Sequence, residues 1–190
     1  MVLLTSQYTK LKKGDAAPDF DLGGIDGKRH SLGSFSGKKA FLVIFMCNHC
    51  PYVKPKMEYI AKLQDVYGPQ GLQIVGINSN DPTNYPEDGP EGMKRVATAK
   101  KFHFPYLVDK TQETARAYGA VCTPDPYLLD GGSKLVYHGR LDDAHGEPHE
   151  NGKTQEIEDA LKQLLAGKTV TVETRPSMGC SIKWKAENGL

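Results

Sequence analysis

Two nearly continuous hydrophobic runs of this chain are separated by a segment of helical periodicity. Residues 40–46 are all apolar and rich in branched and aromatic side chains, and residues 72–77 are apolar except for one glutamine. Runs of this length predict strands that are buried on both faces of a sheet. Between them, residues 52–67 carry apolar side chains near the helical period, and Gly68 and Gly71 mark the expected end of that helix.

The remaining predicted elements are shorter. Residues 19–22 and 29–32 flank a glycine-rich turn and predict a β-hairpin. Residues 78–90 are dense in Asn, Asp and Pro and predict a loop. The rest of the chain predicts helices over residues 91–102, 112–118 and 153–165, and strands over 106–108, 127–129 and 134–138.

This order gives a β-hairpin, a βαβ unit, a further helix and strand, a helix, a ββ pair and a final helix. Alternating strands and helices predict an α/β fold with a mixed, mostly parallel central sheet flanked by helices on both faces. A ββα unit that follows a βαβ unit is typical of the thioredoxin fold. A length of 190 residues suits one domain. We therefore expect residues 1–190 to form a single thioredoxin-like domain, with a core over about 14–166 and a C-terminal tail, 167–190, that packs back on it.

Composition and charge narrow the choice of partners. Hydrophobic residues make up 38% and charged residues 25% of the chain, as in ordinary globular proteins. The net charge is +1, which gives no reason to expect nucleic acid or an anionic membrane as a partner. The longest apolar run is much shorter than the about 20 residues of a membrane span. The N-terminal residues lack the pattern of a signal peptide, so a cytoplasmic location is expected.

The candidate chemistry lies directly after the first apolar run. Cys47 and Cys50 are separated by Asn48 and His49 and followed by Pro51. Four cysteines are too few for a disulfide-stapled scaffold, and a pair at this spacing is suited to redox catalysis or metal binding. The positive end of the following helix would favour a thiolate. We expect Cys47 to be the exposed attacking thiol and Cys50, one turn further in, to resolve the mixed disulfide.

Two features of this motif have alternative interpretations. A ring N–H of His49 beside Cys47 would stabilise the thiolate and make the disulfide more oxidising. Alternatively, His49 is only an exposed residue at the helix start. The cysteine pair itself is a redox centre in the leading interpretation, and a metal site or inert packing in the others.

A second segment, Cys122-Thr123-Pro124, precedes a predicted strand. In thioredoxin folds this position holds a cis-proline that faces the cysteine pair and leaves the preceding backbone able to pair with an extended substrate. Thr123 and Pro124 fit this position, and Pro126 is the rival; an ordinary trans proline is the alternative. Cys122 is either a small buried residue or a third redox or metal-binding thiol. Cys180, in the tail, is either a buried thiol or a resolving one.

Seven segments together resemble a known family: residues 45–54, 76–81, 85–88, 104–107, 122–125, 137–140 and 179–184. They resemble the peroxiredoxin-like redoxins of the alkyl-hydroperoxide-reductase/thiol-specific-antioxidant (AhpC/TSA) branch of the thioredoxin superfamily. The resemblance extends from about residue 14 to residue 186. It implies a thioredoxin fold with an N-terminal β-hairpin and a thiol-dependent oxidoreductase or antioxidant activity. It also implies that Cys47 is the reactive position.

Two positions depart from the patterns of this superfamily. Peroxiredoxins carry Thr or Ser three residues before the peroxide-reactive cysteine, and Ile44 stands there. Thioredoxin has a buried acid in the strand before its motif, which relays a proton to the second cysteine. Residues 40–46 contain no acid. Either an acid from elsewhere serves, or Cys50 deprotonates more slowly.

The leading expectation is therefore a thiol–disulfide oxidoreductase that uses the Cys47/Cys50 couple, without a cofactor or metal. Its substrates would be protein disulfides or low-molecular-weight thiols, and a thioredoxin- or glutathione-type reductant would recycle it. One alternative is a thiol-dependent peroxidase that acts on peroxide. Another is a copper or zinc carrier that uses Cys47 and Cys50, with His49 or Cys122. Outside this centre, residues 142–150 predict a solvated polar loop, and Arg140 predicts a surface ion pair.

Overall fold

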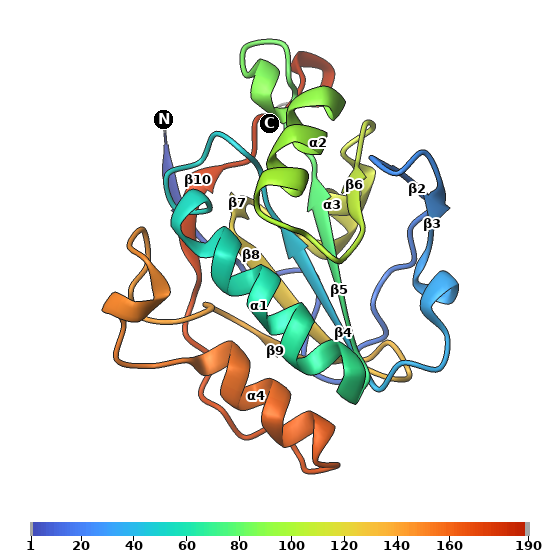
Figure 1. The fold of residues 1–190 in the computed structure, drawn as a ribbon, viewed down its shortest axis with the longest axis vertical. Helices are drawn as coiled ribbons and strands as arrows, with labels where there is room; N and C mark the ends of the chain where they lie inside the picture. The colour runs from blue at the N-terminus through green and yellow to red at the C-terminus, as the bar shows by residue number, and fades with distance from the viewer. Residues whose placement is uncertain (1, 189–190) are drawn as a thin grey trace.

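The computed structural model describes residues 2–188, and at the centre of this part of the chain lies a seven-stranded sheet (Figure 1). Its strands follow the order β3-β2-β6-β5-β4-β8-β9. Their bounds are β2 (Leu22–Gly24), β3 (Arg29–His30), β4 (Ala40–Phe45), β5 (Leu72–Asn78), β6 (Tyr106–Val108), β8 (Asp125–Asp130) and β9 (Leu135–His138).

The sheet is mixed, as predicted, but it is not mostly parallel. Strand β4 pairs parallel with β5, with Ala40 opposite Leu72, and antiparallel with β8, with Ala40 opposite Asp130. Among the described residues, β4–β5 and β5–β6 are the parallel pairs of this sheet, and the others are antiparallel. The short connections of the N-terminal hairpin and of β8 to β9 can join only antiparallel neighbours, and they supply both edges.

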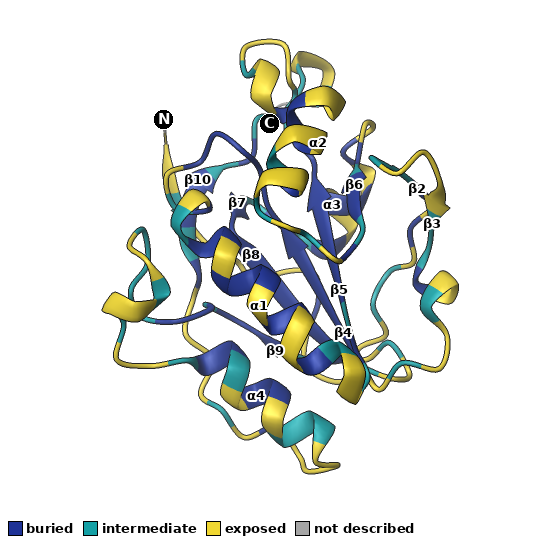
Figure 2. Ribbon diagram, in the orientation of Figure 1, coloured by how far each residue is buried: buried dark blue, intermediate teal, exposed yellow. Residues whose placement is uncertain are grey.

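Helices cover both faces of the sheet, which explains the unbroken apolar run of β4. The helices are α1 (Met57–Tyr67), α2 (Pro90–Ala99), α3 (Glu113–Tyr118) and α4 (Glu156–Leu165). Leu42 and Ile44 pack in one apolar cluster with residues of α1, α2 and α4, whereas Val43 packs with residues of α3 in the other. Figure 2 shows buried strands at the centre and exposed outer faces on the helices in front. Within residues 2–188, none of the helices has the length and hydrophobicity to cross a membrane.

The helix after the cysteine motif begins later than predicted. The periodicity placed its start at Tyr52, but residues 51–53 form a turn, Lys54–Lys56 form one turn of 3₁₀ helix, and α1 begins at Met57. Pro55 explains the difference, because proline lacks an N–H to donate and disfavours helical geometry in the residue before it.

A second, three-stranded sheet was not predicted. It consists of β1 (Leu3–Thr5), β10 (Met178–Ser181) and β7 (Cys122–Thr123), in that order. Strand β10 belongs to the C-terminal tail and lies between the other two, antiparallel to both. The tail therefore runs back across the end of the central sheet at which β4 reaches Cys47 (Figure 1).

Candidate thiol site

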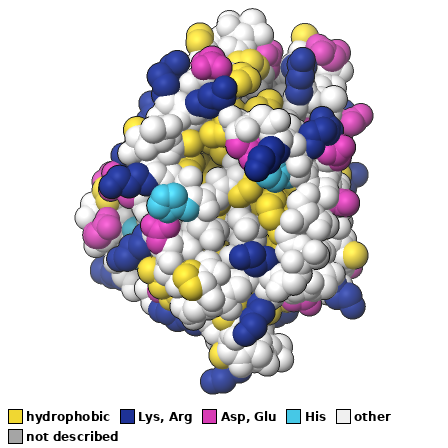
Figure 3. Space-filling view, turned by 45° about the vertical axis from the view of Figure 1, so that its right-hand side comes forward, with side chains coloured by type: hydrophobic (Ala, Val, Ile, Leu, Met, Phe, Trp, Pro, Cys, Tyr) yellow, Lys and Arg dark blue, Asp and Glu magenta, His cyan; other side chains and the backbone are white. Residues whose placement is uncertain are grey.

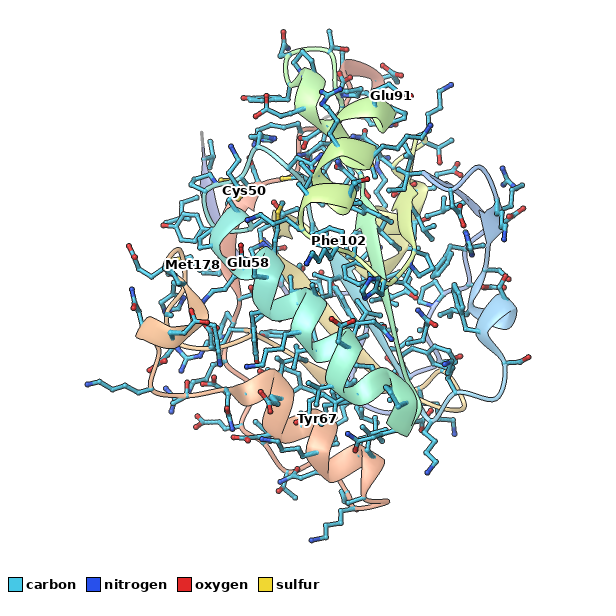
Figure 4. All side chains as sticks on the ribbon, viewed as in Figure 1. Cys50, Glu58, Tyr67, Glu91, Phe102 and Met178 are labelled. Carbon is cyan, nitrogen blue, oxygen red and sulfur yellow. The ribbon has the colours of Figure 1, made fainter. Side chains whose placement is uncertain are left out.

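Cys47 and Cys50 lie in the segment that leads from the end of β4 to the first turn before α1. Figure 4 shows Cys50 beside the start of that helix, with Met178 of β10 nearby. Both cysteines are reduced, and their thiols are hydrogen-bonded to each other. The spacing of two residues thus places the two sulfurs side by side, a geometry that disulfide formation requires.

The cis-proline segment faces this pair. The Thr123–Pro124 peptide bond is cis, as the sequence predicted. The hydroxyl Oγ1 of Thr123 lies 3.3 Å from the sulfur of Cys47, and the Cys50 thiol donates to the carbonyl oxygen of Thr123 at 3.3 Å. The rival, Pro126, lies within β8 opposite Ile44. Thr123 is thus in hydrogen-bond contact with both sulfurs, while its functional role stays a prediction.

The predicted exposure of Cys47 is wrong. Both Cys47 and Cys50 have 0% of their surface exposed. Both cysteines belong to a hydrophobic core cluster, and two long-range contacts add to their burial: Asp88 lies within 4.8 Å of the sulfur of Cys47, and Cys180 on β10 is hydrogen-bonded to Cys50. A partner can therefore reach the sulfurs only if one of these covering segments moves.

The predicted ionisation of the pair is also reversed. Burial raises the pKa of Cys47 well above its ordinary value, and the neighbouring Cys50 and the Asp88 carboxylate raise it further. The pKa of Cys50 is lowered to about 5, first by the hydrogen bond from Cys47 and then, against burial, by donors from Cys180 and the Tyr52 N–H. Two adjacent thiols share one proton, and the sulfur with more donors keeps the charge. In this conformation the thiolate belongs to Cys50.

A buried carboxylate that the sequence analysis did not single out completes this site. Asp88 is 2% exposed and accepts hydrogen bonds from the Asn48 N–H at 2.6 Å, from His49 Nδ1 at 2.5 Å and from Asn80 Nδ2 at 2.9 Å. Burial opposes its ionisation, but the bonds from His49, Asn80 and Asn48 outweigh burial and hold the pKa of Asp88 below its usual value. An acid from the loop thus stands near the dithiol, although β4 contains none. The signal in the sequence was the acidic pair at the end of the loop, which the family resemblance already included.

His49 is buried, so the interpretation as an exposed residue at the helix start is wrong. Its ring stacks on Tyr85 with 4.0 Å between centroids, and its Nδ1 donates to Asp88. Within the described residues, its Nε2 is buried without a hydrogen-bond partner. Cys47, His49 and Asp88 can each offer one ligand atom within 4.8 Å of the others. Among the described residues, this trio could hold a metal ion. It includes Asp88, which the predicted set lacks, and it leaves out Cys50 and Cys122, which the predicted set includes.

Cys122 lies on β7 with its side chain fully buried, opposite Ser181 of β10. Burial raises the pKa of this thiol, and the nearby carboxylate of Asp125 raises it further. A thiol that stays protonated at neutral pH is a weak nucleophile and a weak metal ligand. These observations favour the packing interpretation of Cys122.

The sequence predicts a solvated polar loop over residues 142–150, but part of this loop is buried. Asp142 is 2% exposed and accepts hydrogen bonds from Lys56 Nζ at 2.5 Å and from His149 Nδ1 at 2.9 Å. A lysine within a helical pattern ordinarily lies on the solvated face of the helix, so the sequence pattern alone does not indicate this buried pair. Arg140 does form an ion pair, 2.5 Å from Glu156, but the two side chains are only 15% and 10% exposed, so the prediction of a surface pair is wrong.

Two surface hollows lie away from the sulfurs. One is lined by β2 and α3 residues, and the other by α2 and residues 102–106; neither includes a cysteine. Figure 3 shows apolar side chains at the floor of a hollow on one face of the molecule. The dithiol is therefore covered by its own chain rather than open in a surface pocket.

Comparisons with known proteins agree with this geometry. The family model described as Redoxin matches residues 12–161. A relative named thiol-disulfide oxidoreductase ResA, from Geobacillus thermodenitrificans (strain NG80-2), is 28% identical over 130 residues, which are 68% of this chain and 70% of the relative.

Solved structures extend the likeness to the whole chain. An uncharacterized conserved protein from Geobacillus kaustophilus is 43% identical, covers 98% of each chain and superimposes with a TM-score of 0.90. A thiol:disulfide interchange protein of the thioredoxin family from Chlorobium tepidum TLS is 18% identical, covers 83% of this chain and 98% of that one, and has a TM-score of 0.61. At that identity the second match shows the fold alone, and it confirms the predicted thioredoxin fold.

Proposed function

The chain belongs to the redoxin family, as its motifs indicated, and on this basis we propose that it is a thiol–disulfide oxidoreductase that works through Cys47 and Cys50. The observation that carries the proposal is the contact between the two thiols beside Thr123, the residue before the cis-proline. The relatives named thiol-disulfide oxidoreductase support the same class of reaction.

The reaction needs one thiolate and one thiol, and the pair supplies both. The thiolate attacks one sulfur of a partner disulfide, and the second partner sulfur leaves as a thiolate. The remaining cysteine loses its proton and attacks the mixed disulfide, which closes the Cys47–Cys50 bond and releases the partner's other sulfur. Two electrons and two protons pass from the protein to the partner. A low pKa at Cys50 supplies the first thiolate at neutral pH.

Both cysteines are covered, so the reaction also requires access. The segment that contacts Cys50 is β10, and the segment that contacts Cys47 carries Asp88. We propose that protein disulfides or low-molecular-weight thiols are the substrates. A thioredoxin- or glutathione-type reductant in the cytoplasm would restore the dithiol, since a chain with few cysteines suits a reducing compartment.

Mass spectrometry combined with a turnover assay tests the proposal. The reduced protein is treated with oxidised glutathione and digested with trypsin, which releases residues 40–56 as one peptide with both motif cysteines. A loss of two hydrogens within this peptide is expected. Dithiothreitol-dependent reduction of insulin should be abolished by Cys47→Ser and by Cys50→Ser, and retained by Cys122→Ser. Full activity in the double variant lacking both motif cysteines would contradict the proposal.

The peroxidase alternative receives mixed support. Peroxiredoxins carry a hydroxyl side chain at the position of Ile44, and here Ile44 is apolar and fully buried in β4. The Thr123 hydroxyl lies 3.3 Å from Cys47 instead, but burial raises the pKa of that thiol. Peroxide turnover by wild-type protein at rates near those of a free thiol would remove this alternative.

The metal-binding alternative rests on Cys47, His49 and Asp88, whose ligand atoms lie within 4.8 Å of one another. A cysteine, a histidine and a carboxylate suit Zn²⁺. If this site is used, elemental analysis of the purified protein should find metal in a stoichiometric amount, and Asp88→Asn should remove it. Metal-free protein that keeps full redox activity would exclude the metal-binding alternative and leave the oxidoreductase proposal standing.

A further inference from the structure

The C-terminal strand β10 pairs with the chain at the edge that precedes the cis-proline. In this antiparallel register Cys180 stands opposite Thr123, and Ser181 stands opposite Cys122. This is the backbone edge at which the sequence analysis expected an extended substrate to pair. The protein thus fills that edge with a strand of its own.

Close contacts hold β10 in this place. A Cβ atom built on Gly179 would lie 1.8 Å from the carbonyl oxygen of Thr123, so the approach of the two strands is possible only with glycine at this position. Before the strand, Ser177 Oγ donates to the carbonyl oxygen of Pro124 at 2.6 Å. After the strand, the Lys183 N–H donates to Asn80 Oδ1 at 2.8 Å. The tail is therefore held to the rest of the chain both before and after β10.

The strand brings a third thiol to the pair. Cys180 is 2% exposed and hydrogen-bonds to Cys50 through both its side chain and its backbone. Cys50 thus lies between two thiols, those of Cys47 and Cys180. Hydrogen-bonded sulfurs need only a small approach to reach the 2.05 Å of a disulfide.

We propose that Cys180 is a third redox thiol, held by β10 where a substrate strand would present its cysteine, and that it exchanges disulfides with Cys50. The inference rests on the proposed function of Cys47 and Cys50. In the oxidised protein, the Cys180 thiolate attacks the sulfur of Cys50. The Cys47–Cys50 bond breaks, its electron pair stays on Cys47, and Cys47 takes up the proton that Cys180 has lost. One disulfide replaces another, so no further oxidant is consumed.

The charge balance of the site favours this step only in the oxidised state. In the reduced protein, the pKa of Cys180 is raised to about 12 by burial first and then by its hydrogen bond to Cys50 and the charge of that thiolate. When Cys50 is part of a disulfide, the two causes that depend on its thiolate disappear, and Cys180 becomes a better nucleophile. The exchange joins the tail strand to the motif through a Cys50–Cys180 disulfide and frees the thiol of Cys47.

Tryptic mapping separates Cys180 and Cys122 from the motif pair, because the four cysteines fall in three different peptides. Cys47 and Cys50 lie in residues 40–56, Cys122 lies in residues 117–134, and Cys180 lies in residues 169–183. The variant Cys47→Ser is reduced, treated with one equivalent of oxidised glutathione, quenched with iodoacetamide and digested. Cys50 first forms a mixed disulfide with glutathione, and Cys180 then displaces the glutathione.

The expected main product joins peptide 40–56 to peptide 169–183, and this product should be lost when Cys180→Ser is added. Cys122→Ser is the matched control, since it removes a buried thiol next to β10 and should leave the linked product unchanged. Cys50 that remains glutathionylated while Cys180 is alkylated would overturn the inference. Should the variant fail to fold, the same linked peptides are sought in oxidised wild-type protein, where their absence has the same meaning. Wild-type protein that forms no disulfide at Cys50 would contradict the proposed function itself.

Discussion

The ring of His49 donates to the carboxylate of Asp88 over 2.5 Å, and both side chains are buried beside the dithiol. This contact links the residue between the two cysteines to a loop about forty positions further along the chain. After burial and the hydrogen bond with Cys50, the charge of this carboxylate is a further cause of the raised pKa of Cys47. The Asp88 charge therefore provides the first prediction.

Asp88→Asn removes this charge and keeps the size of the side chain. The pKa of Cys47 should fall, because one of the groups that raises it is gone. The free energy of unfolding should fall by about 1–3 kcal/mol, since buried donors of Asn48 and His49 lose a charged acceptor. Thiolate absorbance against pH and urea denaturation measure the two effects. The neighbouring Glu87→Gln, at an exposed position, is the control and should change neither. An unchanged titration in Asp88→Asn would show that the carboxylate does not act on the pair.

Cys50 provides a prediction on pH. Its pKa is about 5 in the folded protein, against about 8.5 in an unfolded chain. Between these values the folded state binds fewer protons than the unfolded state, so this group adds stability as pH rises and loses it as pH falls toward 5. The urea midpoint of reduced wild-type protein should therefore rise more between about pH 6 and pH 8 than that of Cys50→Ser. Cys122→Ser, which removes a thiol with a raised pKa, should keep the wild-type slope. Equal slopes in all three proteins would contradict a low pKa at Cys50.

The buried pair of Lys56 and Asp142 gives a prediction on stability alone. Lys56→Met keeps most of the side-chain volume but removes the positive charge that pairs with the buried carboxylate of Asp142. The free energy of unfolding should therefore fall by about 3–5 kcal/mol. Lys100→Met, which breaks an exposed pair with Glu58, should cost about 0–1 kcal/mol. Urea denaturation of the two variants provides the comparison. Similar small losses in both would mean that the Lys56 pair contributes no more than a surface contact.

These buried charges also show why the sequence revealed only part of the site. Strand β4 was predictable because burial on both faces demands an unbroken apolar run. The cis-proline was predictable because its place relative to the next strand is fixed by the fold. Lys56 and Asp88 were not, because a charged residue in a sequence indicates solvent unless its partner is known.

Strands β7 and β10 escaped prediction for a different reason. They form a sheet with each other and with β1, segments far apart in the chain, and a local pattern does not reveal such long-range pairing. The error on Cys47 follows from this omission and from that of Asp88, because local sequence placed the thiol at an open helix start. Long-range pairing of the tail and the loop then covered the pair. The least predictable part of the fold is thus the part that controls access to the sulfurs.

A substitution at Gly179 tests whether β10 controls access to the sulfurs. Gly179→Ala places a methyl group against the carbonyl oxygen of Thr123, so β10 must move away from β7. The overpacking should cost about 1–3 kcal/mol. Because β10 covers Cys50, the reduced variant should react faster with iodoacetamide at Cys50 than the wild type does. Gly23→Ala is the matched control, since a Cβ atom there has no neighbour within 4 Å. Faster alkylation in both variants would indicate general loosening. Unchanged alkylation in Gly179→Ala would show that β10 does not limit access, and the dithiol would then have to open through the loop that carries Asp88.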